Sequence, residues 1–265
     1  MKISVVTPNY NTGFYLPRCL DSILRQRSDR FELELIVVDG GSSDDSMAVI
    51  DRYRSELSRV IAEPDDGPAD AINKGLAAAT GDVLAWLNAD DEYVDGALDR
   101  VVDAFEQAPD VALCFGHCPI IDEGGEEIRV GITRFKEMFY PISSRFVIQS
   151  INYISQPAMF FRRGAFESAG PLRTDMKAAW DYEFVLRLWR EGGAKRVGRP
   201  ALAHFRWHPG SIGGQHFRLQ FKEGFDAAVA DAGRFSLQAL LHWFVRWGIV
   251  GSYSLMARNQ ETSST

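Results

Sequence analysis

The sequence predicts an α/β fold in which a mostly parallel, Rossmann-like central sheet is flanked by helices. Three observations predict this class. Short apolar runs alternate with amphipathic segments of helical period in the first part of the chain, and each run ends in a polar, turn-forming cluster. The composition, 265 residues with 46% hydrophobic and 25% charged, is typical of a soluble globular chain with a large core.

The elements follow in order from these patterns. Buried strands are predicted for four apolar runs, at residues 3–6, 33–38, 59–62 and 83–87. One amphipathic helix is predicted between each pair of consecutive strands, at residues 15–26, 45–55 and 69–79. Right-handed connections between parallel strands would bring the carboxyl ends of the strands to one crevice, where open α/β sheets bind their ligands.

Charge and cysteine content narrow the class of function. The net charge of −7 and the pI of about 5.3 argue against non-specific electrostatic binding of nucleic acid. Three cysteines without paired spacing, Cys19, Cys114 and Cys118, are interpreted as reduced core residues. The first apolar run is too short for a secretory signal, so a cytoplasmic protein is expected.

Acidic and amide side chains stand directly after the predicted strands. Asn88-Ala89-Asp90-Asp91 follows the run at residues 83–87, and Asp39 extends the run at residues 33–38. An ionised acid at a buried edge needs a partner, and a divalent cation is a common one. A surface turn or a helix cap would use the same residue types, so both interpretations are open at this point.

These clusters, in this order, resemble those of the family 2 glycosyltransferases, inverting nucleotide-sugar transferases with a GT-A fold. The resemblance spans residues 1–212 and extends through Gln156-Pro157, Trp180-Asp181 and His208-Pro209. The motifs that carry it in the first half are residues 4–11, 36–44 and 63–75, and residues 79–82, which lead into residues 86–91.

The resemblance implies roles for the matching positions. Asn88 stands where the family has the first Asp of an Asp-any-Asp motif, which moves most of the metal binding onto Asp90. The implied ligands of Mn²⁺ or Mg²⁺ are Asp90, with Asp91 as a helper or a structural acid, and His208, which a purely structural role would explain equally well. The implied nucleotide-sugar contacts are Thr7, Pro8, Tyr10, Asp39, Asp65, Asp70, Asn73, Lys74, Asn88, Ala89 and Asp90, although Asp70 would also suit a helix cap.

Asp181 is the expected general base. A helix is predicted over residues 181–191, with its apolar side chains three, four and seven positions after Asp181, so this carboxylate starts on the buried face. By itself this pattern favours a helix cap over a catalytic base, and it is the resemblance that implies the base. On the acceptor side, Gln156, Trp180 and Trp86 are candidates, with core packing as the alternative for all three.

The expected organisation is a GT-A catalytic domain at residues 1–214 and a helical extension at residues 215–265. Within the domain, residues 1–110 would bind the nucleotide-sugar and residues 111–214 the acceptor. A helix is predicted around residues 235–256, with Leu237, Leu240 and Phe244 on its apolar side and Gln238 and His242 opposite. That apolar side would pack on the catalytic domain or a second subunit, or lie on the inner face of the cytoplasmic membrane.

The expected function is metal-dependent, inverting transfer of a sugar from a nucleoside-diphosphate sugar, with uridine as the expected base. The expected acceptor is a hydroxyl of a saccharide or lipid-linked glycan, as in cell-surface polysaccharide assembly. A non-catalytic nucleotide-binding or partner subunit with the same fold is kept open by Asn88. A sugar nucleotidyltransferase is disfavoured because residues 7–13 lack a glycine-rich, basic loop.

Overall fold

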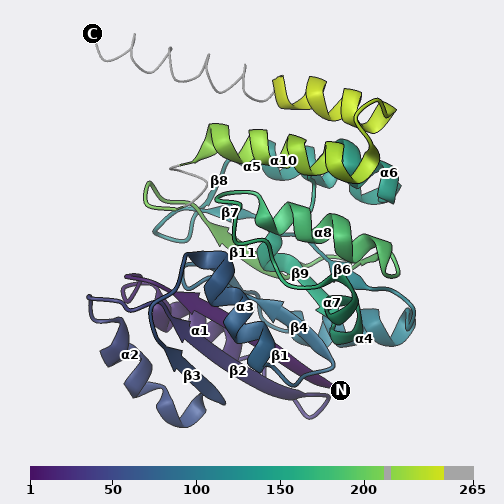
Figure 1. Ribbon diagram of the computed structural model, residues 1–265. Helices are drawn as coiled ribbons and strands as arrows, with labels where there is room; N and C mark the ends of the chain where they lie inside the picture. The colour runs from purple at the N-terminus through teal and green to yellow at the C-terminus, as the bar shows by residue number, and fades with distance from the viewer. Residues whose placement is uncertain (212–215, 248–265) are drawn as a thin grey trace, which may run out of the picture.

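The computed structural model describes residues 1–211 and 216–247. Its centre is a seven-stranded sheet (Figure 1). The strands of this sheet are β1 (Lys2–Asn9), β2 (Glu32–Asp39), β3 (Arg59–Ala62), β4 (Val83–Trp86), β6 (Leu113–Phe115), β9 (Met159–Arg162) and β10 (Ala194–Arg196). Their spatial order is β10-β6-β9-β4-β1-β2-β3, and all are parallel except β9, which is antiparallel to both of its neighbours. The mostly parallel sheet confirms the predicted fold class.

Helices cover both faces of this sheet, as the alternation of strands and helices predicts. On one face lie α1 (Leu16–Leu24), α2 (Ser46–Arg52), which is followed by η1 (Arg54–Glu56), and α4 (Ala97–Gln107). On the other face lie α3 (Pro68–Ala78) and α8 (Trp180–Arg190). Successive residues of a strand point to opposite faces. Val5 therefore packs in the hydrophobic cluster under α1, α2 and α4, and Val6 packs in the cluster under α3 and α8.

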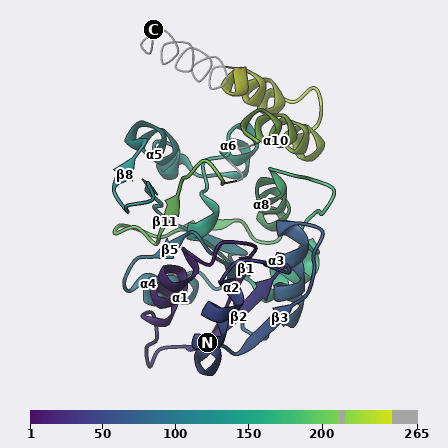
Figure 2. The same ribbon diagram turned by 90° about the vertical axis from the view of Figure 1, so that its left-hand side faces the viewer.

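A smaller, four-stranded sheet joins the second half of the chain to the first (Figure 2). Its order is β5-β11-β7-β8, formed by β5 (Glu92–Tyr93), β7 (Ile120–Ile121), β8 (Glu127–Ile128) and β11 (Ala203–Arg206). The β7–β8 pair is an antiparallel hairpin, and Gly125 has a φ of +95° in its turn, a conformation that favours glycine. This sheet brings β11 and the residues after it next to the carboxyl end of β4.

The second half also contains several short helices. Among them, α5 (Val130–Glu137) is not among the helices predicted from the sequence, and it buries one residue, Thr133. The others are η2 (Tyr140–Ile142), α6 (Arg145–Ser150), η3 (Gln156–Ala158), α7 (Arg163–Ala169) and α10 (Phe217–Ala232). In the parts of the chain that the structure describes, no helix has both the length and the apolar character needed to cross a bilayer.

A last helical stretch, residues 237–247, follows α10, and the rest of the predicted helix, residues 248–256, lies outside the described residues. The structure corrects the face by which it packs. Gln238 donates to Gln149 Oε1 at 3.2 Å, and His242 is buried against Tyr182 and Phe225, whose rings lie 5.7 and 6.0 Å from its own. The polar side therefore finds hydrogen-bond and ring partners on the fold, and the apolar side faces outward.

Candidate active site

Asp39 closes β2 at the carboxyl edge of the sheet and is almost fully buried. Asn9, at the end of the neighbouring β1, donates to Asp39 Oδ2 at 2.7 Å. Ser42 donates to the same carboxylate through its backbone N–H at 2.8 Å and its hydroxyl at 2.7 Å, and the Gly41 N–H donates at 3.1 Å. These bonds fix the Asp39 carboxylate in one position without a cation.

The other predicted residues at the end of β1 differ in accessibility. Thr7 and Pro8 are buried, and Thr7 pairs with Val37 of β2. Tyr10, one residue beyond the strand, keeps 63% of its surface exposed, so its ring is free to contact a ligand at this edge. Of these three predicted contacts, Tyr10 is the side chain that a nucleotide could reach directly.

The loop after β3 lies against the loop after β2. A Cβ placed on Gly40 would come within 2.2 Å of Asp65 Oδ2, so only glycine lets this carboxylate approach the residue that follows Asp39. Asp65 Oδ1 in turn accepts from the Gly67 N–H at 2.9 Å, just before α3. The structure thus brings Asp39 and Asp65 to one place, as the sequence predicts.

The predicted contacts on α3 have protein partners of their own. Asp70 accepts from the Asp66 N–H at 3.2 Å and pairs with Lys74 at 3.3 Å, one turn further along. Lys74 also pairs with Glu63 at 3.1 Å, which raises the pKa of its ammonium group. Asn73 Nδ2 donates to the Leu172 carbonyl at 2.9 Å, and Asn73 Oδ1 accepts from the Leu172 N–H at 2.8 Å. In this structure Asn73 therefore fastens α3 to the second half of the chain.

Asp90 and His208 meet beside the carboxyl end of β4. Asp90 Oδ2 lies 3.0 Å from His208 Nε2, although the residues are 118 positions apart, because β11 runs antiparallel to β5 just after the Asn88–Asp91 turn. The hydrogen bond to Asp90 raises the pKa of His208. Tyr15, at the start of α1, covers the imidazole with ring centroids 5.1 Å apart.

Asp91 and Arg206 lie buried beneath this turn. Asp91 is 1% exposed, and its Oδ1 accepts from the Arg206 backbone N–H at 2.8 Å. Burial, with the neighbouring Asp90 charge, raises the pKa of Asp91 well above its usual value. The Arg206 side chain is also buried and donates to the Asp90 carbonyl at 3.0 Å and to the Asp122 carbonyl at 2.7 Å. Asp91 is thus held as a structural acid, while Asp90 faces His208.

Asn88 occupies the first position of the turn with two long, weak contacts. Its amide Nδ2 lies 3.4 Å from Asp91 Oδ2 and 3.4 Å from Gln156 Oε1. Ala89, next to it, is buried. Within residues 1–211 and 216–247, no three His, Cys, Asp or Glu side chains form a cluster able to hold a metal ion. The protein groups that point at one another here are the oxygen of Asp90 and the nitrogen of His208.

Asp181 stands in the first turn of α8, where its Oδ1 accepts from the Tyr182 N–H at 2.7 Å. Burial raises the pKa of Asp181, and the positive charge of Lys136 on α5 opposes that rise. Lys136 is itself shielded from water, which lowers its pKa, and its ammonium donates to Ser155 Oγ at 3.2 Å. A carboxylate with a raised pKa is better suited than an ordinary Asp to take a proton.

The predicted acceptor residues are mostly buried. Trp180 and Trp86 are 5% and 0% exposed, with ring centroids 6.0 Å apart, so their rings pack in the core. Gln156 is 9% exposed and donates to the Trp86 carbonyl at 2.8 Å, which places it behind Asn88. Core packing, the alternative that the sequence left open, describes both tryptophans.

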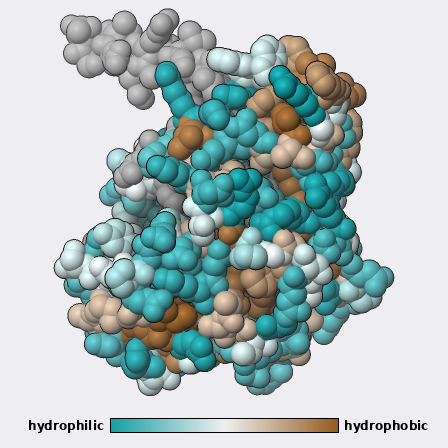
Figure 3. Space-filling model, in the orientation of Figure 1, coloured by the Kyte–Doolittle hydropathy of each residue, from teal (hydrophilic) through white to brown (hydrophobic). Residues whose placement is uncertain are grey.

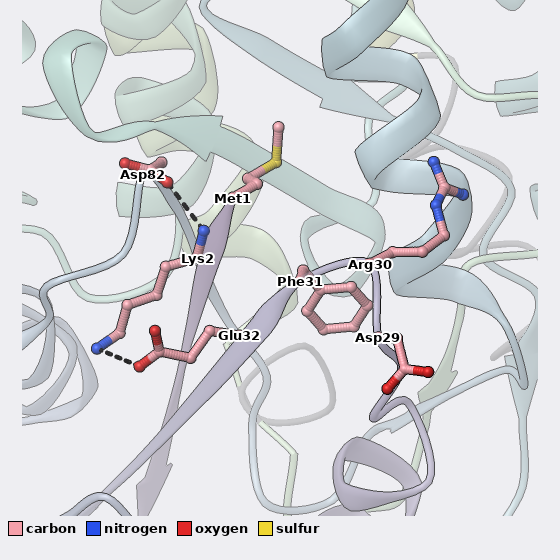
Figure 4. Close-up of a pocket in the computed structure, with 7 residues that line it drawn as sticks. All are labelled: Met1, Lys2, Asp29, Arg30, Phe31, Glu32 and Asp82. Carbon is pink, nitrogen blue, oxygen red and sulfur yellow. Dashed lines mark hydrogen bonds and ion pairs between the residues drawn. The ribbon is translucent and has the colours of Figure 1, made fainter.

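Two of the surface hollows among the described residues bear on where a ligand could bind. One, of about 450 Å³, is lined by Lys2, Phe31 and Asp82 at the amino ends of β1 and β2, opposite the edge that holds Asp39 (Figure 4). Ligands of open α/β sheets bind at the carboxyl ends of the strands, so this hollow lies at the edge of the sheet that such ligands do not use. The other, of about 320 Å³, is lined by Asp122, Glu123, Gly124, Ile128, Trp207 and Pro209; the last two are the chain neighbours of His208.

The family model of glycosyl transferase family 2 matches residues 4–170, which is more than half of the chain. The chain belongs to glycosyltransferase family 2. An uncharacterized glycosyltransferase of Nostoc sp. is 31% identical over 214 residues, which cover 78% of this chain and 65% of that protein. A PGL/p-HBAD biosynthesis glycosyltransferase of Mycobacterium bovis is 31% identical over 191 residues, 69% of this chain and 68% of the relative.

Solved structures confirm the GT-A fold of this family 2 member. S. aureus TarS 1–349 in complex with UDP-GlcNAc has a TM-score of 0.69 and 18% identity, over 91% of this chain and 69% of that one. The mannosyltransferase PcManGT from Pyrobaculum calidifontis, in complex with GDP-Man and Mn²⁺, has a TM-score of 0.63 and 18% identity, over 99% of this chain and 80% of that one. The chain spans 41% of the longer TarS structure and 65% of the Nostoc relative.

Arg206 and Lys136 contact or influence predicted site residues, but the sequence analysis does not identify either of them. Arg206 stands between two aromatic residues and looks like part of a strand, and Lys136 lies in a stretch that carries none of the motifs named above. A buried strand rarely contains an unpaired arginine, so Arg206 carried a weak signal of a nearby acid. Nothing in the sequence connects Lys136 to Asp181, because the contact depends on the path of the chain between them.

Proposed function

We propose that this family 2 protein transfers a sugar from a nucleoside-diphosphate sugar to a hydroxyl group, with inversion at the anomeric carbon. The supporting observation is the Asp90–His208 pair at the carboxyl end of β4, at the same sheet edge as Asp39 and Asp65. Asp39, Asp65 and the exposed Tyr10 would bind the nucleoside, and a uridine nucleotide is the first candidate. TarS was solved with UDP-GlcNAc and PcManGT with GDP-Man, so relatives with this fold differ in the base they take.

The residues at the turn after β4 suit a divalent cation. Asp90 and His208 offer one oxygen and one nitrogen donor 3.0 Å apart, while both oxygens of Asp91 are engaged by Arg206 and Asn88. Asp90 and His208 would hold Mn²⁺ or Mg²⁺, with the donor diphosphate and water completing its ligands. When bound, the cation supplies positive charge where the diphosphate leaves. PcManGT was solved with Mn²⁺.

Asp181 would act as the general base in a single displacement. The acceptor hydroxyl gives its proton to the Asp181 carboxylate as its oxygen forms a bond to the anomeric carbon. The bond from that carbon to the diphosphate breaks on the opposite side, and the nucleoside diphosphate leaves with the electron pair. Burial, which raises the pKa of Asp181, makes this carboxylate a stronger base than one in water.

The acceptor would enter through the hollow of about 320 Å³ that Trp207 and Pro209, the chain neighbours of His208, help to line. Trp207 lines it, and an aromatic ring is a common platform for a sugar. The backbone of its Asp122–Gly124 turn is fixed, because Arg206 donates to the Asp122 and Glu123 carbonyls at 2.7 and 3.2 Å. A saccharide or lipid-linked glycan is the proposed acceptor class. A non-catalytic nucleotide-binding subunit is the competing proposal.

The first experiment is titration calorimetry of UDP, GDP, dTDP and CDP, each with Mn²⁺ and with EDTA. We expect one nucleotide to bind with Mn²⁺, and Asp90→Ala to weaken that binding at least about tenfold, because it removes a charged ligand. Asp29→Ala is the matched control, since Asp29 is exposed at the opposite edge of the sheet (Figure 4).

The outcomes separate the proposals. Binding of no nucleotide contradicts the assigned nucleotide site. Binding that is equal in EDTA and in Asp90→Ala keeps the nucleotide site and removes the cation. If a nucleotide binds but its sugar-linked form is neither hydrolysed nor transferred, the non-catalytic proposal replaces the enzymatic one.

A further inference from the structure

The helix at residues 237–247 exposes an unusually apolar surface. Phe235, just before it, is 98% exposed, and three of its own aromatic residues are between 43% and 58% exposed. In the described parts of the chain, seven of the fourteen large hydrophobic residues that are exposed lie between residues 235 and 247. We call these seven the apolar face: Phe235, Leu237, Leu240, Leu241, Trp243, Phe244 and Trp247.

This face is continuous because of helical geometry. At about 100° per residue, the positions from 237 to 247 that belong to the apolar face fall within less than half of the helix circumference. Ala239, His242 and Val245 fall on the other half, where the first two are buried and Val245 packs on the core. Figure 3 shows hydrophobic side chains gathered over the end of the molecule where Figure 1 draws this helix in yellow.

The charges around the face are of one sign. From residue 233 to residue 260 the sequence has no Asp or Glu. Arg234 is exposed at the start of the face. Arg246 is half-buried on the packed side of the helix, where its guanidinium lies 5.6 Å from the Phe225 ring and 5.8 Å from the Trp247 ring. The preceding acid, Asp231, is buried and paired with Arg145 at 2.8 Å, so it does not neutralise these cations.

We propose that the apolar face binds the surface of a bilayer that contains anionic lipids. Trp and Phe side chains partition into the boundary between headgroups and acyl chains, and an exposed arginine beside them pairs with anionic headgroups. Charge complementarity favours this partner over a second copy of the chain. Two copies of the face would bring arginine next to arginine, with no acid of the same segment to pair with them.

The test is co-sedimentation of the full chain with vesicles, without substrate, so its result is independent of the transfer reaction. We expect binding to vesicles of phosphatidylcholine with phosphatidylglycerol and much weaker binding to phosphatidylcholine alone. Phe244→Ser should weaken binding about tenfold, because it removes one aromatic side chain that would be buried in the bilayer. Arg234→Gln should weaken binding to the anionic vesicles alone, by about fivefold.

Phe14→Ser is the matched control, because Phe14 is 73% exposed but lies after β1, and Phe244 is 58% exposed. Binding of this control should equal that of the wild type. The proposal is overturned if the chain does not sediment with anionic vesicles, or if it binds neutral vesicles equally well. It is also overturned if light scattering shows a dimer that Phe244→Ser converts to a monomer, since a second copy would then cover the face.

Discussion

Asp39, Asp90 and Asp91 show how their surroundings assign different roles to similar carboxylates. Asp39 accepts four hydrogen bonds from Asn9, Gly41 and Ser42, and it is fixed before any ligand arrives. Asp91 is buried on the Arg206 backbone. Asp90 instead keeps part of its surface exposed and faces a histidine. A ligand would therefore meet a rigid nucleoside contact and one adaptable charged pair.

Replacing Asp181 by Asn should lower kcat by about a hundredfold to ten-thousandfold, with a small change in the KM for the donor. The amide has the shape of the carboxylate but cannot take the proton. Transfer of radiolabelled sugar to the acceptor measures the effect, and calorimetry on the same variant checks that nucleotide binding is kept. A variant that keeps more than a tenth of the wild-type rate would remove Asp181 from the base role.

The pH profile tests the same assignment from another side. Since burial raises the pKa of Asp181, kcat/KM should fall toward acid pH earlier than an ordinary Asp would require. Lys136 opposes that rise, so Lys136→Met should move the acid limb to higher pH, and Lys136→Arg should leave it near the wild type. An acid limb that stays in place in Lys136→Met would mean that another group controls it.

Among the elements, α3 packs closely on β1 and β2 and so fixes the loops at the carboxyl edge of the sheet. A Cβ on Gly75 would come within 2.2 Å of Val6 Cγ1 and 3.1 Å of Val38 Cγ2. The absence of a side chain lets α3 lie directly on both strands. The polar residues before α3, including Asp65, are thereby held next to Gly40.

Gly75→Ala should accordingly lower the free energy of unfolding by about 1–3 kcal/mol, because the added methyl group overpacks the helix–sheet contact. Gly164→Ala is the matched control: Gly164 lies within α7, and its Cβ would meet no atom within 4 Å. There the higher helix propensity of Ala should leave stability equal or raise it by up to about 1 kcal/mol. Urea unfolding of both variants measures the difference, and equal losses would contradict the packing argument.

At the scale of the whole molecule, Asp231 joins the C-terminal helices to the catalytic fold. Its carboxylate on α10 is 6% exposed and pairs with Arg145 of α6 and Arg190 of α8. Gln149 Nε2 donates to it at 2.7 Å. One side chain thus connects three helices, including the helix that positions Asp181, so residues 216–247 are packed as part of the same unit.

Asp231→Ala should destabilise the protein by about 2–4 kcal/mol, because it leaves two arginines and a glutamine without their shared acceptor. Asp226→Ala, on the same helix, is the control. Asp226 pairs with Lys222 at 2.8 Å, and both side chains are more than half exposed, so its loss should cost less than about 1 kcal/mol. Hydrogen exchange on α8 and α10 would report the difference, and unchanged protection in Asp231→Ala would contradict the role given to it.

The sequence by itself determined the α/β class, the order of the first strands and helices, and the edge at which polar residues meet. These are local properties: apolar periodicity sets each element, and parallel connection sets which ends converge. The strand predicted at residues 59–62 matches β3, and the helix predicted over residues 181–191 is displaced by one position from α8.

Only the tertiary structure decided which polar groups meet and which are buried. Asp91 meets Arg206 across 115 residues, and the charge of Lys136 acts on Asp181 from a helix that buries only Thr133. The C-terminal helix turns its polar side inward because Gln149, Tyr182 and Phe225 offer partners for His242 and Gln238. Periodicity shows that a helix has two faces, but the groups across from it determine which face is buried.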